Sequence, residues 1–242
     1  MAAELLNVWE EGAGDPPYLR ALRLLAAALP DRTATNLAAW SLGRRDSALL
    51  SLREQLFGSR LSAVADCPTC SARLEFDFDT VDIRAPYADE HNEPLPPLHS
   101  QAADHLTYTI RFRPLTTGDL IDAVADPGRS ALIARCVIEA CREDESIPPN
   151  ELPAEVLADC ARALAACDPQ ADVLIALTCP DCGRHWEAPF DIGAYLWHEL
   201  EGWARRTLRE IHVLASVYGW TEPEILALSA ARRRIYLDMV TQ

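Results

Sequence analysis

A short motif that occurs twice constrains the fold of this chain more than any other feature. Residues 67–79 and 179–191 both read C-P-x-C-x3-(L/W)-E-x2-F-D, so the same residues recur at identical offsets. In the first copy, Leu74, Phe76 and Phe78 alternate with acidic residues, which is the period of a half-buried strand. The sequence therefore predicts two knuckles, each a tight turn with two cysteines followed by a short strand.

The four cysteines of the two copies have the spacing of metal ligands. Two residues between paired cysteines let both thiolates reach one ion at about 2.3 Å, and a tetrahedral structural zinc site takes two such pairs. Gly183 follows the second pair, where such a turn often requires a positive φ. We therefore predict one structural Zn2+ per chain, bound by Cys67, Cys70, Cys179 and Cys182.

Other interpretations of the cysteine pairs are that the thiols are simply buried or that they form redox pairs. A redox C-x-x-C lies at the N-terminus of a helix, whereas strands are predicted after both pairs here. His185 is not expected to be a ligand, because Arg73 occupies the matching position in the first copy. The remaining cysteines lie in segments with a helical pattern and are expected to be small buried hydrophobic residues: Cys136, Cys141, Cys160 and Cys167.

The hydrophobic periodicity predicts an α+β fold that is mostly helical, with a split zinc ribbon, a long α/β insert and a C-terminal helical hairpin. The expected regions are an N-terminal helical region at 1–65, the ribbon at 66–82 with 178–191, the insert at 83–177 and the C-terminal helices at 192–242. Within them we expect helices at 19–29, 45–57, 130–142 and 151–166, a helix beginning at Thr116, strands at 106–114 and 171–178, and an irregular proline-rich linker at 84–105.

The charge of the chain disfavours nucleic acid and anionic membranes as partners. The 242 residues carry a net charge of −15, and all 22 basic residues are arginine. The insert contributes most of this charge, with 16 acidic residues against 7 arginines. No apolar stretch reaches the ~20 residues of a membrane-spanning helix, and the first residues carry no basic leader. The sequence thus predicts a cytoplasmic protein without a membrane partner.

An amphipathic helix is predicted from Ile192 to Tyr218, with Gly219 as its end. The segment Thr221–Glu224 then has the pattern of a capping box for a second helix. The spacing also fits a helix-turn-helix, so a zinc-ribbon regulator that binds nucleic acid is the alternative function. Against it, the second helix would present Glu222 and Glu224 to phosphates, and the ribbon strands are acidic.

No catalytic pattern is present in the sequence, which lacks a glycine-rich phosphate loop, G-x-S-x-G and H-E-x-x-H. Four thiolates would also leave no open coordination position for activating water. We therefore expect a protein that is not an enzyme and has no small-molecule substrate.

The C-terminal region is the expected docking surface for a protein partner. A helix buries one stripe, and Leu196, Leu200 and Trp203 occupy it, which leaves Trp197 about 100° away. The predicted partner-binding residues are Trp197, Trp220, Arg232, Arg233 and Arg234. The alternative is that both tryptophans cover the ribbon or the insert.

The order of these motifs resembles the baseplate hub assembly family of T-even-type phage contractile tails. Relatives of that family are also found in gene clusters of phage-derived extracellular contractile injection systems. The resemblance rests on these segments: Gly43–Arg53, Phe57–Gly58, Cys67–Cys70, Cys179–Gly183, Phe190–Ile192, Leu196–Trp197, Glu210–Ala215, Tyr218–Leu228 and Arg232–Tyr236.

The resemblance implies a non-enzymatic structural or chaperone-like role in building a baseplate or hub. The implied partners are baseplate or hub proteins of a contractile tail-like particle. The protein would be cytoplasmic or incorporated into that particle.

Overall fold

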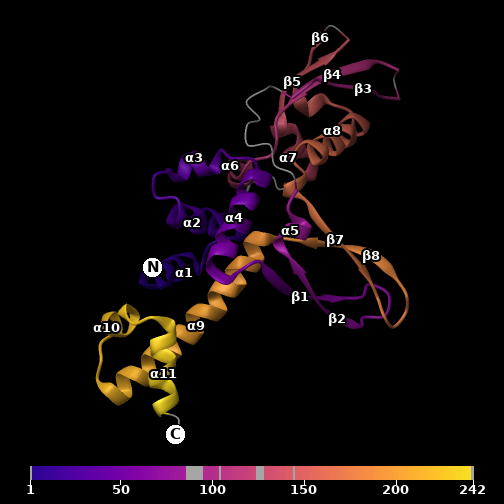
Figure 1. Cartoon of the computed structure of the whole chain (residues 1–242). Coiled ribbons are helices and arrows are strands. Elements are labelled where there is room, and N and C mark those ends of the chain that lie inside the picture. The colour runs from indigo at the N-terminus through magenta and orange to yellow at the C-terminus, as the bar shows by residue number, and fades with distance from the viewer. Residues whose placement is uncertain (1, 86–94, 104, 124–127, 144, 241–242) are drawn as a thin grey trace. The chain divides into compact units, whose positions relative to one another are not determined.

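The computed structural model describes residues 2–85, 95–103, 105–123, 128–143 and 145–240 (Figure 1). The chain divides into two compact units, one formed by residues 1–31 with 193–242 and the other by residues 32–192. Helices predominate and the sheets are small and antiparallel, so the predicted mostly helical α+β class is confirmed. No helix in the described part of the chain combines the length and the apolar character needed to cross a membrane.

The first unit is helical throughout its described residues. Its core joins Leu6 to Ala204, Ile211, Leu214 and Ile225. The long helix α9 runs as predicted to Tyr218, and a capping box at Thr221 begins the next helix. The helices of this unit are α1 (Ala2–Gly12), α2 (Pro17–Ala28), α9 (Ile192–Tyr218), α10 (Glu222–Ala227) and α11 (Ala230–Val240).

The second unit begins with α3 (Ala34–Ala38) and α4 (Leu42–Phe57). The Ser41 side chain caps α4, and Gly58, with φ 87°, ends it as predicted. Leu49 and Leu50 on α4 are fully buried. Two hairpins and the insert follow: β1 (Arg60–Asp66), β2 (Arg73–Asp79), α5 (Thr80–Ile83), the insert, β7 (Val173–Thr178) and β8 (His185–Phe190).

The insert has its own sheet and core. Its elements are β3 (Leu98–Gln101), β4 (Thr107–Phe112), α6 (Thr117–Asp122), α7 (Arg129–Cys136), β5 (Val137–Arg142), β6 (Glu145–Ser146) and α8 (Ala154–Cys167), with short 3-10 helices η2 (Pro149–Glu151) and η3 (Pro169–Ala171). The strands pair in the order β3-β4-β5-β6.

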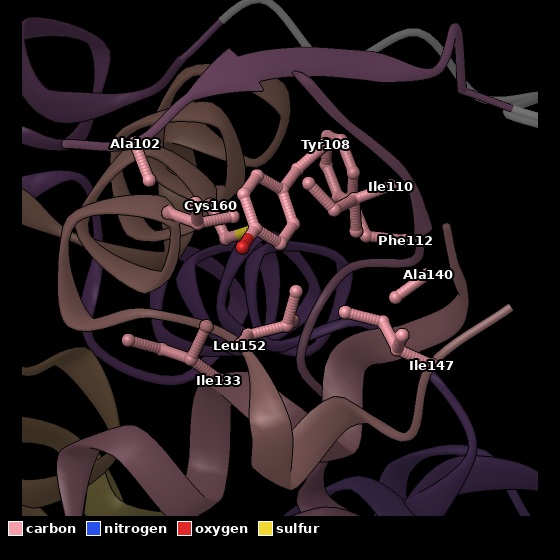
Figure 2. Packing of buried hydrophobic residues seen from close by; sticks show 10 residues of the cluster. Ala102, Tyr108, Ile110, Phe112, Ile133, Ala140, Ile147, Leu152 and Cys160 are labelled. Atoms are coloured by element: carbon pink, nitrogen blue, oxygen red, sulfur yellow. The ribbon is translucent and has the colours of Figure 1, made fainter. Parts of the chain in front are cut away.

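The insert core lies between this sheet and helices α7 and α8 (Figure 2). Tyr108, Ile110 and Phe112 from β4 point into it, because alternate side chains of a strand face the same side. Val156 and Cys160 of α8 meet them there, fully buried. The predicted strand at 106–114 and helix at 151–166 are thus confirmed and form the centre of the insert.

Several predictions of secondary structure are wrong in detail. The predicted helix at 130–142 ends at Cys136, and β5 replaces its second half because β-branched Val137 and Ile138 extend along β4. The predicted helical stretch 1–65 ends at Phe57, since residues 60–66 form β1. The proline-rich linker contains strand β3, whereas its residues 86–94 lie outside the described part of the chain.

Candidate metal centre

Each copy of the repeated motif forms the tip of a β-hairpin. In the first hairpin Arg60 to Asp66 pair with Asp79 to Arg73, and in the second Val173 to Thr178 pair with Phe190 to His185. The strand after each cysteine pair was predicted, and so was the strand before the second pair. The strand before the first pair, β1, was missed because it follows directly on helix α4.

The two turns have the same hydrogen bonds. The Cys67 N–H donates to the Ala72 carbonyl at 2.9 Å, and the Cys179 N–H donates to the Arg184 carbonyl at 2.9 Å. The fifth residue of each turn has a positive φ, 71° at Gly183 as predicted and 59° at Ser71. The duplicated sequence therefore folds into a duplicated turn that presents two thiols on each side.

The four thiols of the two turns come together at one point. Their sulfur atoms all lie within 4.8 Å of one another, with Cys67 3.7 Å from Cys182 and Cys70 3.6 Å from Cys179. A tetrahedron with metal–sulfur bonds of 2.3 Å has sulfur–sulfur edges of about 3.8 Å. The spacing and the donor set thus fit a metal ion that prefers four thiolates.

The hairpins face each other through their apolar sides. The Phe78 and Phe190 rings meet edge to face at 5.4 Å, and Phe76 packs beside Phe78 at 5.8 Å. Glu75 and Glu187 point the other way and are exposed. The inward side chains are mostly half-buried, so the apolar contact between the hairpins is thin.

The thiols have opposing tendencies to ionise. Hydrogen bonds from backbone N–H groups, above all that of Cys70, lower the pKa of Cys67 to about 7. The Ala72 N–H also lowers the pKa of Cys70, but the neighbouring thiols outweigh it and raise that pKa to about 12. Four adjacent thiols cannot all carry negative charge unless a cation compensates them.

No other ligand group joins these cysteines among the described residues. His185 is exposed and contacts the Thr178 hydroxyl at 2.8 Å. Of the other cysteines, Cys136 and Cys160 are buried on helices, and burial raises their pKa values to about 12 and about 11. Cys167 is half-buried at the end of α8, and Cys141 is half-buried on a strand instead of the expected helix.

Two of the five predicted partner-binding residues are buried inside the first unit. Trp197 is 5% exposed, because its ring lies against Gly12 and under the Arg20 guanidinium, so helices α1 and α2 cover the side of α9 expected to be free. Arg233 is also 5% exposed, and its guanidinium donates to Glu210 at 3.1 Å. The expected exposure of these two residues is therefore wrong.

The other predicted partner residues lie around an aromatic cluster. Trp220 stacks on Tyr218 with ring centres 4.7 Å apart and meets Tyr236 edge to face at 4.9 Å. Arg232 lies over the Tyr236 ring, and Arg234 is exposed on α11. Ile235 and Met239, which are not among the predicted partner-binding residues, are 55% and 61% exposed on the same helix.

The fold and the site define a mostly helical α+β protein whose two hairpins join four thiols. Residues 23–192, more than two thirds of the chain, match the family described as T4 bacteriophage base plate protein, and the chain belongs to this family. The match includes both cysteine pairs. It ends at residue 192, before the segments from Leu196 onward on which the resemblance also rests. No curated protein and no solved structure matches the chain.

Proposed function

We propose that this chain is a non-enzymatic, zinc-binding structural or assembly protein of the baseplate or hub of a contractile tail or injection system. Its membership of the baseplate family carries this proposal. Its partners are other baseplate or hub proteins, and it acts in the cytoplasm, where tail particles are built, either as a lasting component or as a chaperone-like factor.

Zinc is the metal that the donor set favours, because four closely spaced thiols match its preference for tetrahedral sulfur ligands. Cys67, Cys70, Cys179 and Cys182 would complete its coordination, which leaves no position for a substrate or a reactive water. The ion would therefore tie the two hairpins together and contribute to folding.

The proposed partner surface consists of Trp220, Arg232 and Arg234, together with the exposed apolar side chains Ile235 and Met239. Aromatic and arginine side chains are enriched among residues that dominate protein interfaces. Nucleic acid is not among the proposed partners, since the chain carries a charge of −15 and α10 begins with two glutamates.

Purification of tail-like particles from cells that express the complete gene cluster tests this proposal. We expect particle yield to fall sharply without this chain, and the Trp220→Ala/Arg234→Glu variant to reproduce the defect while it remains folded and binds zinc. Arg32→Glu, at an exposed arginine of the other unit, is the matched control and should leave assembly unchanged. Normal particle yield without the chain would refute the assembly role.

A further inference from the structure

The two hairpins share a base that is built on helix α4. We propose that Asp168 and Gln170, on the segment leading into the second hairpin, are positioning residues of the four-cysteine centre. They fasten this base so that the two hairpins start side by side and their thiols can meet around one metal ion. This inference rests on the proposed metal-binding role.

The first hairpin is fixed to α4 through the end of its second strand. The buried Thr80 hydroxyl donates to Glu54 on α4, and its N–H donates to the Ser59 carbonyl at 3.0 Å, which closes the base of the hairpin. Arg84 donates to the same Glu54 carboxylate at 3.0 Å. Both ends of the first hairpin are therefore held at one end of α4.

The second hairpin is fixed to the other end of α4 by Asp168. The Gly43 N–H, in the first turn of α4, donates to the Asp168 carboxylate at 2.9 Å across 125 residues of sequence. A carboxylate is stabilised at this position because the first N–H groups of a helix lack partners within it. A Cβ at residue 43 would lie 1.8 Å from an Asp168 oxygen, so only glycine allows this contact.

Gln170 links the two hairpins directly. Its side chain is under 2% exposed, its oxygen accepts from the Ala85 N–H at 2.7 Å, and its amide nitrogen donates to the Ile83 carbonyl at 3.3 Å. Ile83 ends α5, just after the first hairpin, whereas Gln170 lies just before β7. The same buried amide therefore joins the end of one hairpin to the start of the other.

The base of the hairpins must be rigid because the thiols lie far from it. Strands β1 and β7 have 7 and 6 residues between the base and the first cysteine of each turn. At 3.3 Å per residue the thiols lie about 20 Å from the base, so a 10° tilt would shift them by about 3.5 Å. Such a shift is nearly as large as a whole sulfur–sulfur separation, 3.6–3.7 Å, and would disrupt the tetrahedral arrangement.

Zinc affinity of full-length variants, measured by competition with a chromogenic chelator, tests the proposal. Gln170→Leu keeps a similar volume but removes the partner of the half-buried Ala85 N–H and Ile83 carbonyl, and it should bind zinc at least tenfold more weakly. Asp168→Asn keeps an acceptor for the Gly43 N–H and should bind nearly as tightly as the wild type, unlike Asp168→Leu. Equal affinities of Gln170→Leu and the wild type would overturn the proposal.

Ser100→Ala is the matched control for a general loss of stability. Ser100 is buried and donates to Asp159 at 2.6 Å within the insert, so its removal deletes a buried hydrogen bond without touching the base. We expect its zinc affinity to be unchanged even where its unfolding temperature falls as far as that of Gln170→Leu. An equal loss of affinity in both variants would contradict a positioning role.

Hydrogen exchange of the wild-type chain keeps the proposal testable if Gln170→Leu does not fold. After zinc is removed with a chelator, the Gly43 and Ala85 amides should remain protected, because the base forms without metal. Rapid exchange of both amides would overturn the proposal. A wild-type chain that binds no zinc would instead refute the metal-binding role, and the same two amides would still report whether the base forms by itself.

Discussion

The two hairpins and the insert represent different ways of stabilising small β-sheets. The hairpins, residues 60–79 and 173–190, form two separate two-stranded sheets whose inward side chains are mostly half-buried. The insert has a four-stranded sheet with a helical layer and, among its described residues, a cluster of ten buried side chains. Isolated two-stranded sheets are only marginally stable, whereas larger sheets with one face covered can be stable on their own. The hairpins therefore need a cross-link that the insert does without.

Removal of the metal should have the largest effect, and it should be confined to the hairpins. Structural zinc contributes about 10 kcal/mol or more to small modules. We expect a chelator to expose the amides of β1, β2, β7 and β8 to rapid hydrogen exchange, while the amides of β4 and β5 stay protected. Loss of protection throughout the insert would contradict the distinction between the two regions.

Truncation of a side chain in the insert core should destabilise the protein and leave its zinc content unchanged. Ile110 is fully buried among the core side chains, so Ile110→Ala should lower the free energy of unfolding by about 2–5 kcal/mol. Ile138 on the neighbouring strand is 62% exposed, and Ile138→Ala is the matched control with little expected change. Chemical denaturation measures both, and zinc content should stay the same in both variants. Loss of zinc from Ile110→Ala would show that the regions are coupled.

The two turns themselves allow the finest comparison. Gly183 has a φ of 71° and Ser71, at the matching position, a φ of 59°. A side chain in this region costs about 1 kcal/mol, so Gly183→Ala should be destabilising by that amount and Ser71→Gly should be neutral or slightly stabilising. Thermal unfolding of the zinc-loaded protein measures the difference. If both substitutions shifted the unfolding temperature equally and in the same direction, the two turns would not be equivalent.

The cysteine centre could be anticipated from the sequence because its signal is local and repeated. Two copies of C-P-x-C predict that Cys67 and Cys179 belong to the same metal site, because a tetrahedral zinc site takes two cysteine pairs. The structure places the sulfurs of both cysteines in one cluster. The residues that hold the base of the hairpins have no such signal. Asp168 and Gln170 lie beside a proline in an ordinary loop pattern, and their partners are 85 to 125 residues away.

The wrong secondary-structure predictions have a similar cause. The segment at 130–142 has a helical apolar pattern, but pairing with β4 decides the structure from Val137 onward. The misjudged exposure of Trp197 also depends on distant sequence, since helices α1 and α2 cover it. Periodicity identifies which side of a helix is apolar, and it does not show which other segments pack against the remaining sides.

The zinc content of purified wild-type protein and of single cysteine variants tests the central claim, that one metal ion joins the two hairpins. Elemental analysis should find one zinc per wild-type chain and a loss of zinc in both Cys67→Ser and Cys179→Ser, because each removes a ligand of the same ion. Cys136→Ser, at a buried cysteine outside the centre, should retain zinc. Full zinc content in either hairpin variant would contradict the shared site.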